Sequence, residues 1–119
     1  MIDHVKLFVS DLERTVALYE RALEPLGYTV MMDLGELGVA FGRDRPELWL
    51  SGRGERPPTV AHVALRAENR AAVDAFHRAA LNAGATDNGA PGPRPYHPSY
   101  YGAFVLDPDG NNLEAVCHS

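Results

Sequence analysis

The chain has 119 residues, of which 45% are hydrophobic and 23% are charged, and its formal net charge is −5. A chain of this length can bury one core, and its negative charge argues against partners with dense negative charge, such as nucleic acid and anionic lipid. It contains no apolar run near the ~20 residues that cross a bilayer, begins with a strand-like segment rather than a signal peptide and has one cysteine, so we expect a cytoplasmic protein without disulfides.

The first half of the chain predicts a strand, a helix and three further strands. Residues 4–9 (HVKLFV) have the composition of a strand. Ser10 and Glu13 have the spacing of a capping box, so a helix should begin there. Apolar side chains then recur at steps of three and four until Pro25 and Gly27 end the helix. The three strands should follow at residues 28–33, 37–42 and 47–50.

The second half repeats this order. A strand is predicted at residues 62–66, Asn69 is the expected N-cap of a helix that stops at Gly84, and three extended segments follow at residues 85–88, 101–106 and 112–117. The two halves therefore share a βαβββ plan within one domain of residues 1–119. Module 1 covers about residues 1–50, residues 51–59 form a linker, and module 2 covers about residues 60–119.

Two further features of module 2 lead to explicit expectations. Residues 88–99 (NGAPGPRPYHPS) contain four prolines and two glycines, so the sequence predicts a surface loop or lid there and not a regular element. His77 follows Phe76 on the second helix, and we expect it to face solvent.

Three predicted strands carry a polar side chain on the face opposite the helix. Strand side chains alternate between faces, so His4, His62 and Glu114 all point away from the aliphatic positions of their strands. On the concave face of a curved sheet they would converge as two imidazoles and a carboxylate, a metal-ligand set with open coordination positions. A cation would also offset the cost of burying Glu114 unpaired. The alternatives are two partly exposed histidines at strand starts and a solvent-facing glutamate.

These motifs resemble the vicinal oxygen chelate superfamily. The resemblance rests on H-V near the start, H-V-A-L opening the second half and D-P-D-G-N-N-L-E-A-V at residues 107–116, and it covers essentially the whole chain. The superfamily includes glyoxalase I, the fosfomycin- and bleomycin-resistance proteins and the extradiol dioxygenases. The resemblance implies an α+β fold in which two βαβββ modules form a cupped mixed sheet, the glyoxalase/bleomycin resistance/dihydroxybiphenyl dioxygenase-like fold.

The resemblance also implies a site. His4, His62 and Glu114 would bind one divalent ion (Ni, Zn, Mn or Fe), and a small substrate would bind that ion through two neighbouring oxygens. By analogy with glyoxalase I, Glu47 is the candidate fourth ligand or base, although Trp49 shares its strand face and could occupy that position. Lys6 lies on the His4 face and is the second candidate for moving a proton. The candidate pocket residues are Trp49, Phe8, Arg94, His97, Tyr100 and Tyr101.

The function that the resemblance favours is that of a metal-dependent lyase or isomerase of the lactoylglutathione lyase type. A metal-free drug- or metabolite-binding protein of the bleomycin-resistance type is the alternative. Fosfomycin-type thiol transfer is disfavoured because Lys6 stands where those enzymes have a hydroxyl residue. Extradiol dioxygenases are longer and use additional histidine and tyrosine catalysts. Such chains usually dimerise, so a homodimer is expected, with a site either within one chain or shared between subunits.

Overall fold

The structure, a computed structural model, describes residues 1–52 and 57–119 of the chain. Module 1 contains β1 (Val5–Phe8), α1 (Leu12–Leu23), a 3-10 turn (Glu24–Leu26), β2 (Thr29–Asp33), a second 3-10 turn (Gly35–Leu37), β3 (Val39–Gly42) and β4 (Leu48–Ser51). Module 2 contains β5 (His62–Arg66), α2 (Arg70–Asn82), β6 (Thr86–Pro93), β7 (Tyr101–Leu106) and β8 (Asn112–Cys117). Within these two ranges, no helix is long and apolar enough to cross a membrane. Residues 53–56 of the predicted linker lie outside the described residues.

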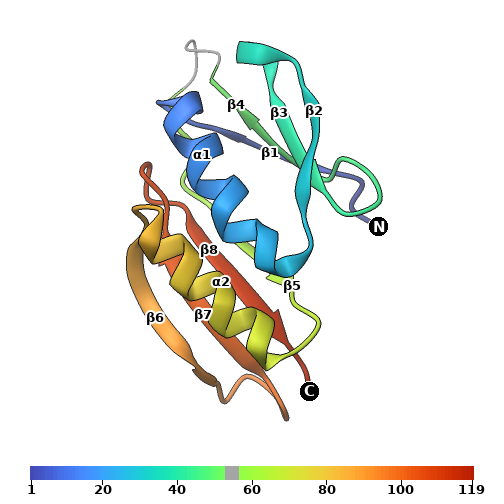
Figure 1. The fold of residues 1–119 in the computed structure, drawn as a ribbon, viewed down its shortest axis with the longest axis vertical. Helices are drawn as coiled ribbons and strands as arrows, with labels where there is room; N and C mark the ends of the chain where they lie inside the picture. Colours follow the sequence, from blue (N-terminus) through green and yellow to red (C-terminus); the bar gives the residue numbers. More distant parts are fainter. Residues whose placement is uncertain (53–56) are drawn as a thin grey trace.

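The two modules have the same sheet topology. The strand orders are β1-β4-β3-β2 and β5-β8-β7-β6, and in each sheet the first and last strands of the module pair in parallel while the other pairs are antiparallel. Helices α1 and α2 pack against each other and cover one face of their sheets (Figure 1). The expected α+β fold with two βαβββ modules is confirmed.

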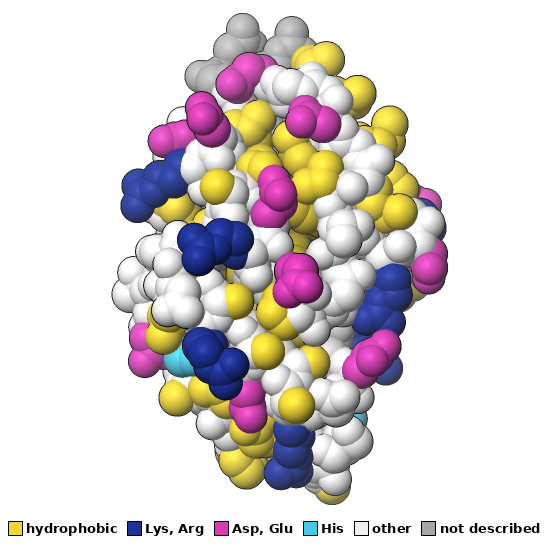
Figure 2. Space-filling view, viewed as in Figure 1, with side chains coloured by type: hydrophobic (Ala, Val, Ile, Leu, Met, Phe, Trp, Pro, Cys, Tyr) yellow, Lys and Arg dark blue, Asp and Glu magenta, His cyan; other side chains and the backbone are white. Residues whose placement is uncertain are grey.

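The core forms where the helices meet the sheets. In β1 and its two flanking residues, Leu7 and Val9 are buried while His4 and Lys6 are exposed, as strand alternation predicts. Tyr19 of α1 and Phe76 of α2 are fully buried against the sheets. Figure 2 shows the outer face of the two helices, where Lys and Arg side chains are interspersed with Asp and Glu. This face therefore has no block of positive charge for a polyanion.

The first helix is capped differently from the expectation. Asp11 is the N-cap, and its carboxylate accepts a hydrogen bond from the Arg14 amide at 3.1 Å. Ser10 instead donates from its amide and its hydroxyl to Asp109, at 3.0 and 2.6 Å. The predicted capping box was wrong because the Ser10 hydroxyl donates instead to Asp109, in the D-P-D-G turn of module 2. Asn69 does cap α2, accepting from Ala72 at 2.8 Å.

The D-P-D-G turn is organised around a buried carboxylate. Asp107 is 5% exposed and accepts hydrogen bonds at 2.9 Å from the amides of Asp109 and Asn111 and from the Asn111 side chain. The hydroxyl of Tyr19 donates to the same carboxylate at 2.7 Å. Burial and the nearby Asp107 raise the pKa of Tyr19 far above its usual range, so this phenol remains a donor. The turn therefore fixes module 2 to the first helix.

Two expectations for module 2 were wrong. Strand β6 continues to Pro93, so half of the segment predicted as an irregular loop is paired with β7. Prolines are tolerated there because β6 is the edge strand of its sheet and its register is interrupted between Asp87 and Gly89 and between Gly89 and Gly92. His77 is buried rather than solvent-facing, and its Nε2 lies 2.9 Å from Asp87 on β6.

The His77–Asp87 pair predicts acid-dependent stability. Hydrogen bonds from the Gly89 amide and from His77 hold the pKa of Asp87 below its ordinary value. Such a carboxyl stabilises the fold above its ordinary pKa, and its contribution is lost as pH falls through the folded-state value. Asp87→Asn should therefore lower the melting temperature at about pH 7, and the difference from wild type should shrink towards about pH 3. Thermal unfolding at both pH values tests this, with the exposed Asp44→Asn as control. An equal loss at both would contradict it.

Candidate functional site

The open face of the second sheet carries a fully partnered carboxylate. Glu114 lies in β8 and is 1% exposed. Its Oε1 is 2.8 Å from Nε2 of His62, which comes from the neighbouring strand β5, and its Oε2 accepts a hydrogen bond from the hydroxyl of Tyr100. Both oxygens therefore have hydrogen-bond partners, which offsets the cost of burying the charge. His62 keeps 54% of its side chain exposed, so this pair is reachable from solvent.

Tyr100 is held as a hydrogen-bond donor. Burial, followed by the hydrogen bond to Glu114, raises the pKa of Tyr100 to about 12. The phenol is therefore protonated at neutral pH and donates to the carboxylate rather than competing with it for a proton.

Aromatic and basic side chains surround this pair. The ring of Tyr100 makes edge-to-face contacts with Tyr96, His97 and His118, with ring centroids 5.0, 5.2 and 5.3 Å apart, and the rings of His97 and His118 stack at 4.4 Å. His118, directly after β8, was not among the predicted site residues, although its position four residues after Glu114 was the available signal.

Arg94 and Tyr101 occupy different surroundings. The Arg94 guanidinium lies 5.3 Å from the ring centroid of Phe104, which is itself 6.1 Å from the ring of His62. The predicted pocket residue Arg94 is therefore near the Glu114 pair. Tyr101 is not, because its hydroxyl donates to Asp74 of α2 at 2.7 Å and its ring lies under Arg70.

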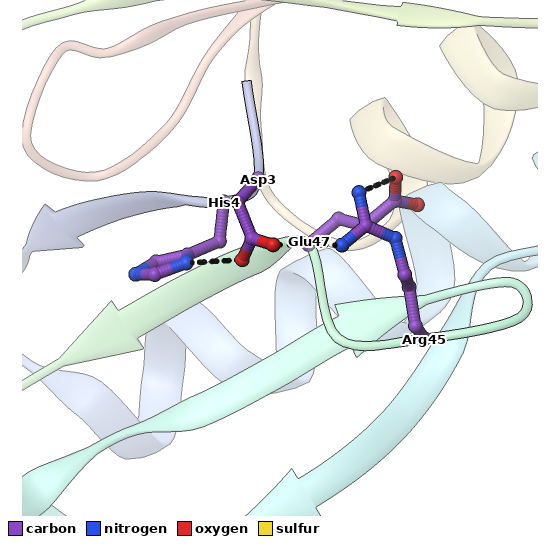
Figure 3. A network of polar contacts seen from close by, with 4 residues as sticks. All are labelled: Asp3, His4, Arg45 and Glu47. Carbon is purple, nitrogen blue, oxygen red and sulfur yellow. Dashed lines mark hydrogen bonds and ion pairs between the residues drawn. The ribbon is translucent and has the colours of Figure 1, made fainter. Parts of the chain in front are cut away.

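His4 lies on the other sheet, in a separate polar network (Figure 3). Its Nδ1 is 2.7 Å from Asp3, whose other carboxylate oxygen is 3.1 Å from Arg45. Hydrogen bonds from His4 and Arg45 lower the pKa of Asp3. Asp3 was not anticipated from the sequence as a partner of His4, although its position directly before the histidine was the available signal.

A pocket of about 530 Å³ opens on this side of module 1. His4, Lys6 and Trp49 line it together with Leu34 and Leu37. Lys6 and Trp49 are direct neighbours in the β1–β4 register, so they share one face of the sheet. One predicted pocket residue, Trp49, and one predicted catalytic residue, Lys6, thus line the same pocket as His4. Phe8 lies at the end of β1 and is half-buried. Its amide donates to the hydroxyl of Thr59, and its carbonyl accepts a hydrogen bond from the Thr59 amide.

Trp49 and Glu47 border two different pockets, and His4 borders both. Glu47 precedes β4, and its carboxylate lies 3.9 Å from Arg45. In Figure 3 this carboxylate and the ring of His4 extend in opposite directions. Glu47 borders a different cavity of about 300 Å³, between β1 and β5, which His4 also borders. The geometry therefore favours Trp49 as the pocket wall at the position that the sequence left open.

The structure thus brings two of the three expected ligands together. His62 and Glu114 lie side by side on the second sheet, whereas His4 lies on the first. Among residues 1–52 and 57–119, no group of three or more His, Cys, Asp or Glu side chains is placed to hold a metal ion.

His62 and Glu114 nevertheless fit one side of a coordination sphere. Two ligand atoms about 2.1 Å from an ion are about 3 Å apart when they lie at right angles, as in an octahedral site, and about 3.4 Å apart in a tetrahedral site. The 2.8 Å between Nε2 of His62 and Oε1 of Glu114 is close to the octahedral separation. Imidazole and carboxylate are also the ligand types that first-row divalent ions accept.

Comparison with known proteins identifies similar chains. A family model described as the Glyoxalase/Bleomycin resistance protein/Dioxygenase superfamily matches residues 1–115. A glyoxalase/bleomycin resistance protein from Albidiferax ferrireducens T118 is 27% identical, with 98% of this chain and 97% of that chain covered and a TM-score of 0.80. A comparison with curated proteins gives no match.

Two further solved structures are similar. A family enzyme from Burkholderia phytofirmans PsJN shares the fold at 19% identity, with 98% of both chains covered and a TM-score of 0.75. A mutant glyoxalase I from Zea mays is 27% identical, with 95% of this chain but 45% of that chain covered and a TM-score of 0.71.

Proposed function

Because this chain belongs to the Glyoxalase/Bleomycin resistance protein/Dioxygenase superfamily, we propose that it is a metal-dependent lyase or isomerase acting on a small substrate with two neighbouring oxygens. The observation that carries the proposal is the pairing of His62 with a buried Glu114 on an open sheet face. These two residues would hold a divalent ion, with His4 as the third ligand. A bound ion of this kind polarises substrate oxygens as a Lewis acid.

We place the complete site between two copies of the chain. His4 faces the module 1 pocket, and His62 and Glu114 face outward from module 2, so a second copy that brings its module 1 over this module 2 would complete the ligand set. Exposed apolar side chains support such an interface. Leu34 and Leu37, which line the His4 pocket, are 50% and 53% exposed.

The remaining side chains have roles that follow from their positions. Lys6 lines the same pocket as His4 and is the proposed group for moving a proton. Glu47 would need to turn away from Arg45 to take that role. Trp49 offers an apolar wall to the substrate, and Arg94 offers a positive charge near Glu114 for an anionic group.

A metal-free binding protein is the second candidate function. It is favoured by one observation, namely that His62 and Tyr100 of the same chain provide hydrogen-bond partners for both oxygens of Glu114. The ring cluster around Tyr100 would then form part of a pocket for a planar drug or metabolite.

Elemental analysis of the purified protein separates the two functions. The enzyme function predicts close to one divalent ion per chain and a higher melting temperature with Ni²⁺, Zn²⁺, Mn²⁺ or Fe²⁺, because a ligand that binds only the folded state stabilises it. Hemithioacetal isomerisation then tests the glyoxalase branch. Protein without metal and without stabilisation by any of the four ions would contradict the enzyme function and favour the binding function.

Mixed dimers test whether the site is shared. His4→Ala and Glu114→Ala chains, refolded together, are expected to regain metal binding that neither shows alone. In each mixed dimer one site carries both substitutions and the other carries none, so about one quarter of the wild-type sites should return after random mixing. Isothermal titration with Zn²⁺ counts them.

The matched control is a mixture of His62→Ala and Glu114→Ala chains. These residues lie on the same sheet of one chain, so no intact site can form in any dimer. Recovery in both mixtures, or in neither, contradicts a site divided between His4 of one copy and module 2 of the other.

A further inference from the structure

We propose that Tyr100 is a positioning residue that orients the Glu114 carboxylate for metal binding. This inference rests on the proposed metal function. The hydroxyl of Tyr100 donates to Oε2 of Glu114, while Oε1 faces His62. A carboxylate held in this way would offer Oε1, beside the imidazole, to a metal ion, while Oε2 stays hydrogen-bonded to Tyr100. Partners that orient ligands in this manner tune the affinity of a metal site.

The loop between β6 and β7 is built to deliver this hydroxyl. The Arg94 amide donates to the carbonyl of Tyr100 at 3.0 Å, and the Tyr100 amide donates to the carbonyl of His97 at 3.3 Å, which closes the loop on itself. Among the described residues, Ser99 is the one non-glycine residue with a positive φ, 63°. A left-handed conformation outside glycine costs energy and persists where the surrounding structure requires it. Here it immediately precedes Tyr100.

Gly102 provides a second, independent observation. It lies in β7 with an ordinary backbone conformation, so no turn requires glycine at this position. A Cβ added there would lie 3.1 Å from Oε2 of Glu114 and 3.2 Å from the ring of Tyr100. Both contacts are tighter than side chains normally tolerate. The missing side chain therefore leaves the space in which the phenol and the carboxylate meet.

The ring of Tyr100 has a separate, structural role that the test must exclude. It packs against Tyr96, His97 and His118, and these contacts stabilise the loop whether or not the hydroxyl matters. Tyr100→Phe keeps the ring and removes the hydroxyl, so it isolates the hydrogen bond to Glu114. Tyr96→Phe is the matched control, because it removes a hydroxyl from the same loop without touching the carboxylate.

Isothermal titration with Zn²⁺ and the visible absorption of the Co²⁺-loaded protein test the proposal. Tyr100→Phe is expected to weaken Zn²⁺ binding about 10- to 100-fold. It should also change the d–d bands of Co²⁺, because a released carboxylate can bind through both oxygens and alter the coordination number. Tyr96→Phe should match wild type in both measurements. Gly102→Ala should weaken Zn²⁺ binding in the same direction, because its Cβ displaces the pair.

The outcomes separate the two levels of inference. If wild type binds Zn²⁺ and Tyr100→Phe binds it equally or more tightly, with unchanged Co²⁺ bands, Tyr100 is not a positioning residue while the metal site stands. If wild type binds neither Zn²⁺ nor Co²⁺, the proposed metal function fails, and this inference fails with it. Thermal unfolding of each variant verifies that the chain is folded.

Discussion

Glu114→Gln is expected to reduce divalent metal binding by more than about 100-fold while the chain remains folded. The substitution keeps the size of the side chain and an oxygen that can accept a hydrogen bond from Tyr100 or His62. It removes the negative charge that the carboxylate beside His62 would offer to a divalent ion. Because Glu114 is fully buried, an isosteric change is a cleaner test than alanine, which would also leave a cavity.

Two measurements check this expectation. Metal content by elemental analysis and Zn²⁺ affinity by titration should both fall, whereas the melting temperature without metal should change little. Glu20→Gln, on the exposed side of α1, is the matched control and should bind as wild type does. Retention of wild-type affinity by Glu114→Gln would falsify the ligand set, whichever subunits contribute to it.

The second large effect concerns stability. Asp107→Ala is expected to lower the free energy of unfolding by about 3 kcal/mol or more, because it leaves several buried donors, including the Tyr19 hydroxyl, without an acceptor. For a domain of this size that corresponds to a fall in melting temperature of about 10 °C. Tyr19→Phe removes one donor and leaves the others, so its effect should be about 1 kcal/mol.

Chemical denaturation of wild type, Asp107→Ala and Tyr19→Phe measures these differences in the free energy of unfolding. Asp44→Ala, on an exposed turn, should be within about 0.5 kcal/mol of wild type. An Asp107→Ala protein as stable as the Asp44→Ala control would contradict this expectation. It would show that the free-energy cost of desolvating the carboxylate equals the stabilisation from its hydrogen bonds.

Most of the secondary structure of this chain could be predicted from local sequence signals. Strand alternation placed His4 on the face opposite the buried aliphatic positions of its strand, and Asn69 marked the start of α2, because these signals depend on neighbouring residues alone. Ser10 failed as a cap because a residue nearly a hundred positions away takes its hydroxyl. The prolines of β6 led to the wrong prediction of an irregular loop for a similar reason. Only the sheet topology shows that this strand lies at an edge.

The sequence predicted which strand faces carry the candidate site residues, but it did not predict the distances between them. Alternation and family resemblance placed His62 and Glu114 on one face, and the structure brings them to 2.8 Å. His4 adjoins β1 of module 1, and each module forms its own four-stranded sheet, so His4 is separated from His62 and Glu114. The sequence carries no local signal for how the two sheets are placed. The Tyr100–Glu114 contact depends on the path of an irregular loop, so it could not be predicted from the sequence either.

The clamp formed by Asp107 and Asp109 has a consequence for biosynthesis. It joins Tyr19 to a partner 88 residues later, and Ser10 to one 99 residues later. On the ribosome, the nascent chain exposes the first helix long before its polar partners leave the exit tunnel. Until then the Tyr19 hydroxyl can hydrogen-bond only to water and not to Asp107. Contacts of such long sequence separation also slow the search for the native topology.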